Sequence, residues 1–258
     1  MKNKVALITG STSGIGLEIA RSLSNNGYNI VINGFATPEI INNITKELAV
    51  KGAEVLYCDA DISKPDEIDS MFSNIYKKFN AIDVLVNNAG VQYVAPIENF
   101  PNEKWDQIIA VNLTSSFYTI KNSITKMKEQ GWGRIINIAS AHGKVASINK
   151  AAYVAAKHGL VGLSKVVALE TAQHNITSNC ICPGFVLTDL VKKQINDIAK
   201  TKNITPKEAE FELLAEKHPS LKFIKPEDIA NMVVYLCSSA ADGITGTEIS
   251  LDGGWLAR

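Results

Sequence analysis

The chain has 258 residues, 46% of them hydrophobic, and its 26 Lys and Arg equal its 26 Asp and Glu, so the formal net charge is zero. This size and composition suit one large α/β domain with a substantial core, and the charge balance argues against nucleic acid or an anionic membrane surface as a partner. The apolar run in the start MKNKVALITG is too short for a signal peptide, and no stretch of about 18 apolar residues predicts a membrane span.

Short apolar runs alternate with helical patterns along most of the chain. We expect strands at Val5–Thr9, Asn29–Asn33, Ala53–Tyr57, Asp83–Asn87, Arg134–Ile138, Ile176–Cys182 and Glu248–Leu251. We expect helices at Ile15–Leu23, Pro38–Lys51, Lys64–Phe79, Glu103–Glu129 and Ala151–Gln173. This alternation predicts a single Rossmann-type domain over residues 1–258, a doubly wound parallel sheet of about seven strands with helices on both faces. Ligands of such sheets bind beyond the carboxyl ends of the strands.

One stretch, residues 188–225, departs from this alternation. It holds two helix-like segments, Leu190–Thr201 and Thr205–Lys217, and no strand. The start of the second segment, TPKE, is typical of an N-cap, a first-turn proline and an N3 glutamate. We favour a helical substrate lid inserted before the last helix–strand unit, because the stretch follows the carboxyl end of a late strand. A packing or oligomer-contact excursion is the alternative.

The stretch TGSTSGIG at 9–16 follows the first expected strand and opens a helix. Gly10 permits a tight turn, Gly14 lets the backbone approach a pyrophosphate, and Gly16 allows close contact between helix and strand. The helix N-terminus adds free N–H groups and a partial positive charge. With a strand before it and a helix after it, this turn predicts a dinucleotide site, although a tight turn without a ligand remains an alternative. The other contacts expected in the turn come from Thr12, Ser13 and Ile15.

The residues after the second strand bear on the choice between NAD and NADP. An acidic residue there favours NAD through the ribose hydroxyls, and a basic residue favours NADP. The stretch Asn33–Phe35 (NGF) is uncharged, and Ser13 supplies no cation for a 2′-phosphate. This lack of positive charge favours NAD. Asp61, after the third strand, is placed to accept a bond from the adenine amino group, or is simply a turn residue before a helix.

Two of the four cysteines, Cys180 and Cys182, lie in an apolar, strand-like run (SNCICPG). No CxxC pair or His cluster accompanies them, so we interpret them as reduced core thiols and expect no metal site. Reduced thiols indicate a cytoplasmic protein.

Tyr153 and Lys157 are four residues apart in a predicted helix and therefore share one face. An ammonium held beside a phenol would lower its pKa toward neutrality, so that Tyr153 could act as a base. Ser140, directly after the fifth strand, is placed to hold a carbonyl oxygen next to the phenol. Each residue alone fits an ordinary surface role. Together, beside a dinucleotide turn, they indicate catalysis.

Further motifs accompany this pair, namely NNAG at 87–90, Asn112 and PG at 183–184. Together with TGSTSGIG, Ser140 and the YxxxK spacing at 153–157, these motifs resemble those of the short-chain dehydrogenases/reductases. The resemblance covers almost the whole chain. The resemblance implies that Tyr153 is the general acid/base and that Lys157 lowers its pKa and holds the nicotinamide ribose. It also implies that Ser140 orients the substrate oxygen and that Asn112 keeps a water in a proton relay. The cofactor contacts expected outside the glycine turn are Phe35, Asp61, Ile62, Asn88, Gly90, Tyr153, Lys157, Pro183, Gly184 and Val186.

A second set of polar and aromatic residues follows the predicted strands. The expected substrate contacts are Gln92, Ser140, His142, Lys150, Tyr153, Gln194 and Trp255. A cation with amide and imidazole donors is suited to binding a carboxylate. Taken singly, each of these residues is as well explained by a polar rim.

As a set, these residues resemble the substrate residues of one group in the family, the bacterial D-3-hydroxybutyrate dehydrogenases. The stretches NGF at 33–35, SAHGKVAS at 140–147, KAAYVAAKHG at 150–159 and CPGFVLT at 182–188 resemble that group closely. The implied reaction is the NAD-dependent, reversible oxidation of (R)-3-hydroxybutyrate to acetoacetate. Many members have tryptophan where this chain has Phe185, so we expect a slightly altered pocket wall.

Two kinds of alternative function remain: an NADP-dependent 3-oxoacyl-thioester reductase or another short-chain dehydrogenase on the same scaffold, and a protein of a different class, a sensor. An NADP-dependent 3-oxoacyl-thioester reductase would need a residue for the 2′-phosphate and room for a carrier arm. A non-catalytic NAD(H)-binding sensor would have no need to keep Ser140, Tyr153 and Lys157. The resemblance also implies a homotetramer, built on apolar surfaces of the two long helices at 103–129 and 151–173.

Overall fold

Seven strands pair in parallel to form one sheet in the order β3-β2-β1-β4-β5-β6-β7. The structure is a computed structural model that describes residues 3–50 and 52–257. The strands are β1 Val5–Ile8, β2 Asn29–Asn33, β3 Val55–Cys58, β4 Val84–Asn87, β5 Gly133–Ile138, β6 Ile176–Pro183 and β7 Glu248–Leu251. Every residue of β1, β2, β4, β5 and β6 is buried, as in a sheet covered on both faces. The predicted parallel sheet is confirmed.

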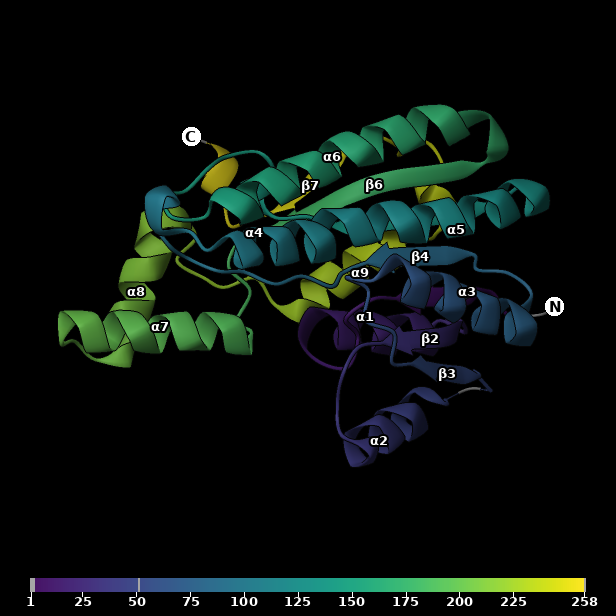
Figure 1. Cartoon of the computed structure of the whole chain (residues 1–258), viewed down its shortest axis with the longest axis horizontal. Helices are drawn as coiled ribbons and strands as arrows, with labels where there is room; N and C mark the ends of the chain where they lie inside the picture. Colours follow the sequence, from purple (N-terminus) through teal and green to yellow (C-terminus); the bar gives the residue numbers. More distant parts are fainter. Residues whose placement is uncertain (1–2, 51, 258) are drawn as a thin grey trace.

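Helices cover both faces of this sheet (Figure 1). On one face α1, α2 and α9 enclose a core that includes Ile8 and Ile32, and on the other α3, α5 and α6 enclose a core that includes Leu7 and Val31. Neighbouring residues of one strand enter different cores because their side chains alternate between the faces. The helices are α1 Gly14–Asn25, α2 Pro38–Leu48, α3 Pro65–Phe79, α4 Asn102–Ile109, α5 Ser115–Gln130, α6 Ala151–Thr171, α7 Asp189–Lys202, α8 Pro206–Lys217 and α9 Pro226–Leu236.

The predicted ends of most elements lie within two residues of the observed ends, and two predicted helices differ further. The helix expected at Pro38–Lys51 ends at Leu48, and Lys51 lies outside the described residues. The long helix expected at Glu103–Glu129 consists of α4, a π-helical turn at Ala110–Thr114 and α5. A pattern of apolar residues does not reveal a π turn, because the chain on both sides remains helical.

The π turn lies where Asn112 binds the loop after β4. The Asn112 side-chain amide donates to the Val91 carbonyl (2.9 Å), and its oxygen accepts from the Val91 N–H (2.8 Å). The Ser115 hydroxyl donates back to the carbonyl of Val111 (2.6 Å). These bonds join the wide turn to the carboxyl edge of the sheet, and π turns of this kind are frequent at functional sites.

The α7–α8 pair extends beyond one end of the sheet (Figure 1). Its second helix has the predicted capping box, in which the Thr205 hydroxyl accepts from the Glu208 N–H (3.3 Å) and Glu208 accepts from the Thr205 N–H (2.8 Å). Apolar residues of the pair share a small core with Phe185, just after β6, and with Trp255, after β7. The pair is thus attached to the carboxyl ends of the last two strands.

The strand order reverses between β1 and β4. Strands β2 and β3 lie on one side of β1, and β4 to β7 lie on the other. The chain segments that follow β1 and β4 therefore diverge beyond the carboxyl ends of the strands, which is where ligands bind in folds of this kind. The glycine turn predicted to hold a dinucleotide is at this position.

Candidate active site

The glycine turn after β1 is bonded to the loop after β4 through Asn88. The Asn88 side-chain amide donates to the carbonyls of Thr9 and Gly10, at 2.9 Å each. The hydroxyl oxygen of Thr9 accepts the N–H groups of Asn88 (3.0 Å) and Ala89 (3.1 Å). Asn88, predicted as a cofactor contact, therefore also fixes the shape of the turn.

Two glycines leave the turn without side chains where the backbones come close. A Cβ on Gly10 would lie 2.8 Å from the Cα of Ala89, and a Cβ on Gly16 would lie 2.3 Å from the carbonyl oxygen of Gly10. Gly14 has φ +55° and begins α1. No acidic residue occupies the first turn of α1, and its N-cap, Ser13, makes no side-chain capping bond. The first amides of α1 are therefore available to an anion such as a pyrophosphate.

A cavity of about 630 Å³ extends from this turn to the ends of β2 and β3. Its wall includes the predicted cofactor residues Gly10, Thr12, Ser13, Gly14, Ile15, Gly16, Phe35, Asp61, Ile62, Asn88 and Gly90. Asn33, Ser63, Gln107 and Thr188 also line it and were not predicted as contacts. The cavity fits a dinucleotide, because the glycines of the turn leave open the space that side chains would fill.

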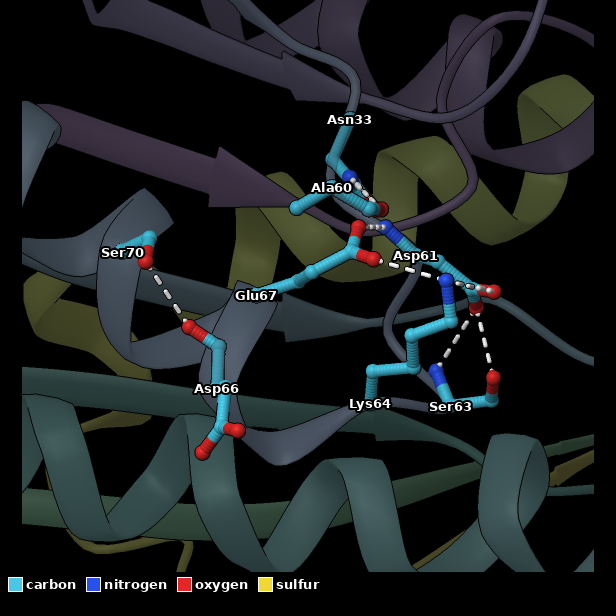
Figure 2. A network of polar contacts seen from close by, with 8 residues as sticks. All are labelled: Asn33, Ala60, Asp61, Ser63, Lys64, Asp66, Glu67 and Ser70. Atoms are coloured by element: carbon cyan, nitrogen blue, oxygen red, sulfur yellow. Dashed lines mark hydrogen bonds and ion pairs between the residues drawn. The ribbon is translucent and has the colours of Figure 1, made fainter.

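Asp61 is held in a polar network at the end of this cavity (Figure 2). Its carboxylate accepts from the N–H (3.0 Å) and the hydroxyl (2.7 Å) of Ser63, and these bonds lower its pKa below the usual range. Its own N–H donates to Glu67 (2.7 Å), which pairs with Lys64 (2.8 Å). Asn33 donates to the Ala60 carbonyl (2.9 Å). Asp61 is therefore an ionised acceptor on a loop held from both sides.

The predicted catalytic residues come together where β5 and α6 meet. Ser140 follows β5, and a hydrogen bond joins its hydroxyl to the phenol of Tyr153 on α6. Lys157, one turn further along α6, donates from its Nζ to the carbonyl of Ile138 (2.7 Å). A Cβ on Gly90 would lie 3.8 Å from this Nζ and 3.5 Å from the Asn112 side-chain oxygen. Three segments of the chain thus converge on the Lys157 ammonium.

The pKa of Tyr153 differs from the prediction. Burial raises the pKa of this phenol above its ordinary value, and the hydrogen bond with Ser140 offsets only part of that rise. The Lys157 Nζ lies 5.7 Å from the Tyr153 ring centroid and is bonded to a backbone carbonyl. Burial also lowers the pKa of Lys157 to about 8. The expectation that Lys157 brings the phenol toward neutrality is therefore not met in this structure.

Two further cavities continue from the cofactor end toward the α7–α8 pair. One, of about 180 Å³, is lined by Tyr153, Lys157, Pro183, Gly184 and Val186 among others, and it shares Ile15, Asn88 and Thr188 with the larger cavity. The other, of about 80 Å³, contains all seven predicted substrate residues in its wall: Gln92, Ser140, His142, Lys150, Tyr153, Gln194 and Trp255. Gly184, Phe185 and Val191 complete that wall.

The His142 imidazole is buried and already has partners within the protein. Its Nε2 lies 2.9 Å from the Ser147 hydroxyl and its Nδ1 lies 3.4 Å from the Ser140 hydroxyl. Burial, then the charge of Lys150, lowers its pKa to about 3, so the ring is neutral at physiological pH. Its edge contacts the rings of Tyr153 (5.9 Å) and Trp255 (5.1 Å). His142 therefore orders the hydroxyl and aromatic walls of the small cavity.

Two residues that the sequence did not single out as contacts, Thr188 and Val191, follow the carboxyl end of β6. Thr188 precedes α7 and Val191 lies within its first turn, while Phe185, expected as a pocket wall, comes just after the same strand. Their position after a late strand was the available signal.

Within the described residues, no three His, Cys, Asp or Glu side chains form a group suited to a metal ion. None of the described helices is long and apolar enough to cross a membrane.

Comparison with known proteins gives consistent matches. A family model described as short chain dehydrogenase matches residues 4–199. The chain is 55% identical over 256 residues to a D-beta-hydroxybutyrate dehydrogenase of Rhizobium meliloti, covering 99% of each chain. It is 50% identical over 258 residues to the protein of the same name from Cupriavidus necator, covering 100% of both. The solved L-sorbose reductase of Gluconobacter frateurii, complexed with NADPH and L-sorbose, has a TM-score of 0.94 at 31% identity, covering 100% of this chain and 98% of its own.

Proposed function

The chain belongs to the short-chain dehydrogenase family, and from that premise we propose that it oxidises (R)-3-hydroxybutyrate reversibly to acetoacetate with NAD. The observation that carries the proposal is the small cavity beside Ser140 and Tyr153, whose wall includes Lys150, Gln92 and Gln194. The two relatives named D-beta-hydroxybutyrate dehydrogenase support the same substrate.

A small hydroxy acid matches this cavity in charge and in hydrogen-bonding groups. The Lys150 ammonium would pair with the carboxylate, and the amides of Gln92 and Gln194 would donate to its oxygens. Burial lowers the pKa of Lys150, and an anionic partner would favour its charged form again. In a thioester the carboxylate is replaced, so such a substrate has no carboxylate to pair with Lys150. This argues against the 3-oxoacyl-thioester reductase alternative.

The residues that would hold the cofactor line the two larger cavities. The glycine turn and the first amides of α1 would bind the pyrophosphate, and Asp61 would accept from the adenine amino group. When bound, the oxidised nicotinamide supplies the acceptor for the hydrogen that leaves the carbinol carbon with its bonding electrons. Lys157 would donate to the ribose hydroxyls, since its Nζ lies beside Gly90 at the joint between the cavities.

Proton transfer is assigned to Tyr153, with Ser140 as its partner. The Ser140 hydroxyl would donate to the substrate oxygen and hold it against the phenol. As the phenolate, Tyr153 would take the hydroxyl proton of the substrate, and as the phenol it would return that proton in the reverse reaction. Burial raises the pKa of Tyr153, so we expect the oxidation rate to rise with pH as the phenolate fraction grows. The Asn112 turn next to Lys157 would hold a water that passes the proton onward.

The preference for NAD is supported by the charges around the large cavity. Among the described residues in its wall, Asp61 is the only charged one, and no Lys or Arg is present. A 2′-phosphate would thus meet no cation in this wall. Initial rates with NADH and NADPH at equal concentration test this point, and we expect NADH to be preferred by at least tenfold, on the order of one ionic contact.

We also propose that the α7–α8 pair is a substrate lid and that the protein is a homotetramer. The lid is supported by Gln194 and Val191 of α7, which line the small cavity.

The tetramer is supported by the exposed apolar side chains of Phe117 on α5 and of Val166 and Leu169 on α6. Light scattering should then give four times the chain mass of 27.9 kDa, and a monomer mass would contradict it.

The test of the main proposal is a steady-state assay with NAD and three substrates. These are D-3-hydroxybutyrate, its L-enantiomer and 2-butanol, a neutral secondary alcohol of the same length. We expect turnover of the D-enantiomer alone, because only it presents both the carboxylate and the carbinol hydrogen correctly. Tyr153→Phe is the inactive control and should still bind NADH. Equal rates on 2-butanol would contradict the proposed carboxylate contacts.

A further inference from the structure

A fully buried histidine ends the second helix of the lid. His218 follows α8, and its N–H donates to the carbonyl of Leu214 (2.6 Å). Its ring lies between the loop after β6 and the glycine turn after β7. It lines none of the three cavities described above, and the proposed mechanism does not use it.

Both ring nitrogens of His218 have backbone partners. Nε2 accepts from the N–H of Phe185 (2.8 Å), and Nδ1 lies 3.0 Å from the carbonyl oxygen of Lys222. Because Nε2 accepts, the proton of the neutral ring sits on Nδ1 and is donated to Lys222. Burial lowers the pKa of the ring and favours this neutral form, against smaller effects of the Lys222 bond and of Asp252. The ring therefore joins the end of α8 to the segment that carries Phe185.

The same ring supports two walls of the small cavity. It stacks on Phe185 (5.3 Å between centroids, 21° between planes) and lies 6.0 Å from the Trp255 ring. Phe185 and Trp255 stack on each other at 5.4 Å, and both line the cavity proposed for the hydroxy acid. Removing the imidazole would leave the far sides of both aromatic walls without support.

Two glycines leave the space that this ring needs. A Cβ on Gly184 would lie 2.3 Å from the His218 Nε2, and a Cβ on Gly253 would lie 2.9 Å from its Nδ1. Gly184 itself lines the small cavity. The imidazole thus fills a gap enclosed by backbone, so it has little freedom to change rotamer.

We infer that His218 is a positioning residue for the substrate cavity: its neutral imidazole holds Phe185 and Trp255 in place and couples their position to the folded lid. This inference rests on the proposed function for the identity of the substrate. The coupling follows from shared contacts, because Ala209 and Leu213 of α8 belong to the same apolar cluster as Phe185 and Trp255. The hydroxy acid would then meet aromatic walls whose position depends on α8, which itself lines no part of that cavity.

Substitutions that separate hydrogen bonding from bulk test the inference. Glutamine carries an acceptor oxygen and a donor nitrogen on one amide, so His218→Gln can keep both bonds, whereas His218→Leu keeps the bulk and loses both. We expect His218→Leu to raise KM for D-3-hydroxybutyrate about tenfold, because the two bonds that fix the ring behind Phe185 and Trp255 are lost. His218→Gln should stay within about threefold of the wild type. KM for NAD should change little in either variant.

His174→Leu is the matched control. His174 is exposed in the short helix that precedes β6, at the opposite end of that strand from Phe185. Its loss should leave both KM values unchanged. If His218→Leu does not fold, His218→Asn, which can reach only one of the two partners, replaces it in the comparison with His218→Gln.

Hydrogen exchange at the Phe185 amide gives a readout that does not need activity. Its protection should fall about tenfold in His218→Leu and remain near the wild-type value in His218→Gln and His174→Leu. If the wild-type protein does not turn over D-3-hydroxybutyrate, the proposed function fails, and the exchange data still test the contact. A folded His218→Leu with wild-type KM overturns the inference. So does a His218→Gln that keeps Phe185 protected yet has the raised KM of His218→Leu.

Discussion

The proposed cofactor end and the proposed substrate end of the active site are built differently. Around the expected pyrophosphate position the cofactor end is mostly backbone: a glycine turn, the first amides of α1 and loops bonded to each other through Asn88. The substrate end is made of side chains from distant segments, including Gln92 after β4, Lys150 before α6 and Trp255 after β7. The cofactor end depends on where side chains are absent. The substrate end depends on which side chains are present, so substitutions there can change the substrate while the cofactor end stays the same.

The largest effect is expected from adding a methyl group at the cofactor end. In Gly16→Ala the new Cβ would lie 2.3 Å from the Gly10 carbonyl oxygen and 2.4 Å from the Asn88 amide nitrogen. The backbone must move, so NADH binding should be lost and the free energy of unfolding should fall by about 2 kcal/mol. Gly243→Ala is the control, since no atom lies within 4 Å of its Cβ position. NADH titration and urea unfolding measure both, and a Gly16→Ala with normal NADH affinity would contradict the backbone-built site.

At the substrate end the decisive change is one of charge. Lys150→Ala should raise KM for D-3-hydroxybutyrate by about 10- to 100-fold, the range for a hydrogen bond to a charged group, with a smaller change in kcat. KM for NAD should stay the same, because Lys150 does not line the cofactor cavities. Lys144→Ala removes an exposed lysine of the same segment and serves as the control. An unchanged KM in Lys150→Ala would contradict the proposed pairing of Lys150 with the substrate carboxylate.

The burial of His142, at the substrate end, predicts that the stability of the protein depends on pH. Its pKa is about 3 in the folded protein, against about 6.5 for an unfolded histidine. Between these values the unfolded chain binds a proton that the folded protein does not. The free energy of unfolding should therefore fall as the pH falls below about 6.5, by up to about 1.4 kcal/mol per pH unit from this group. Urea unfolding at pH 7 and pH 5 should show a smaller loss in His142→Asn, and equal losses would show that the ring is not buried neutral.

The smallest effect is expected at the adenine end of the cofactor cavity. Asp61→Asn keeps an acceptor for Ser63 but removes the charge, so KM for NAD should rise about fivefold with kcat unchanged. Asp66→Asn is the control. It removes an exposed carboxylate from the first turn of α3, which follows the loop of Asp61 (Figure 2), and should leave KM for NAD unchanged. Equal effects of the two substitutions would indicate a general loss of negative charge and not a contact of Asp61.

The sequence alone determined the order of the strands, the position of most helices and the position of the dinucleotide turn. The strands follow from short apolar runs and the helices from a periodicity of 3.6 residues, and both are local properties. The glycine spacing and the Tyr153–Lys157 spacing are local too, since each lies within one turn or one helix. All predicted contacts from the glycine turn and all seven predicted substrate residues line the cavities found in the structure.

Only the tertiary structure decided the environment of those residues. The π turn at Asn112 depends on Val91, 21 positions away, and the position of His218 depends on Phe185, 33 positions away. The pKa of Tyr153 is raised because burial outweighs the hydrogen bond with Ser140, and the degree of burial depends on every segment that surrounds the ring. Local spacing places two groups on one face of a helix, but it does not say how much water remains around them or which carbonyl binds the lysine.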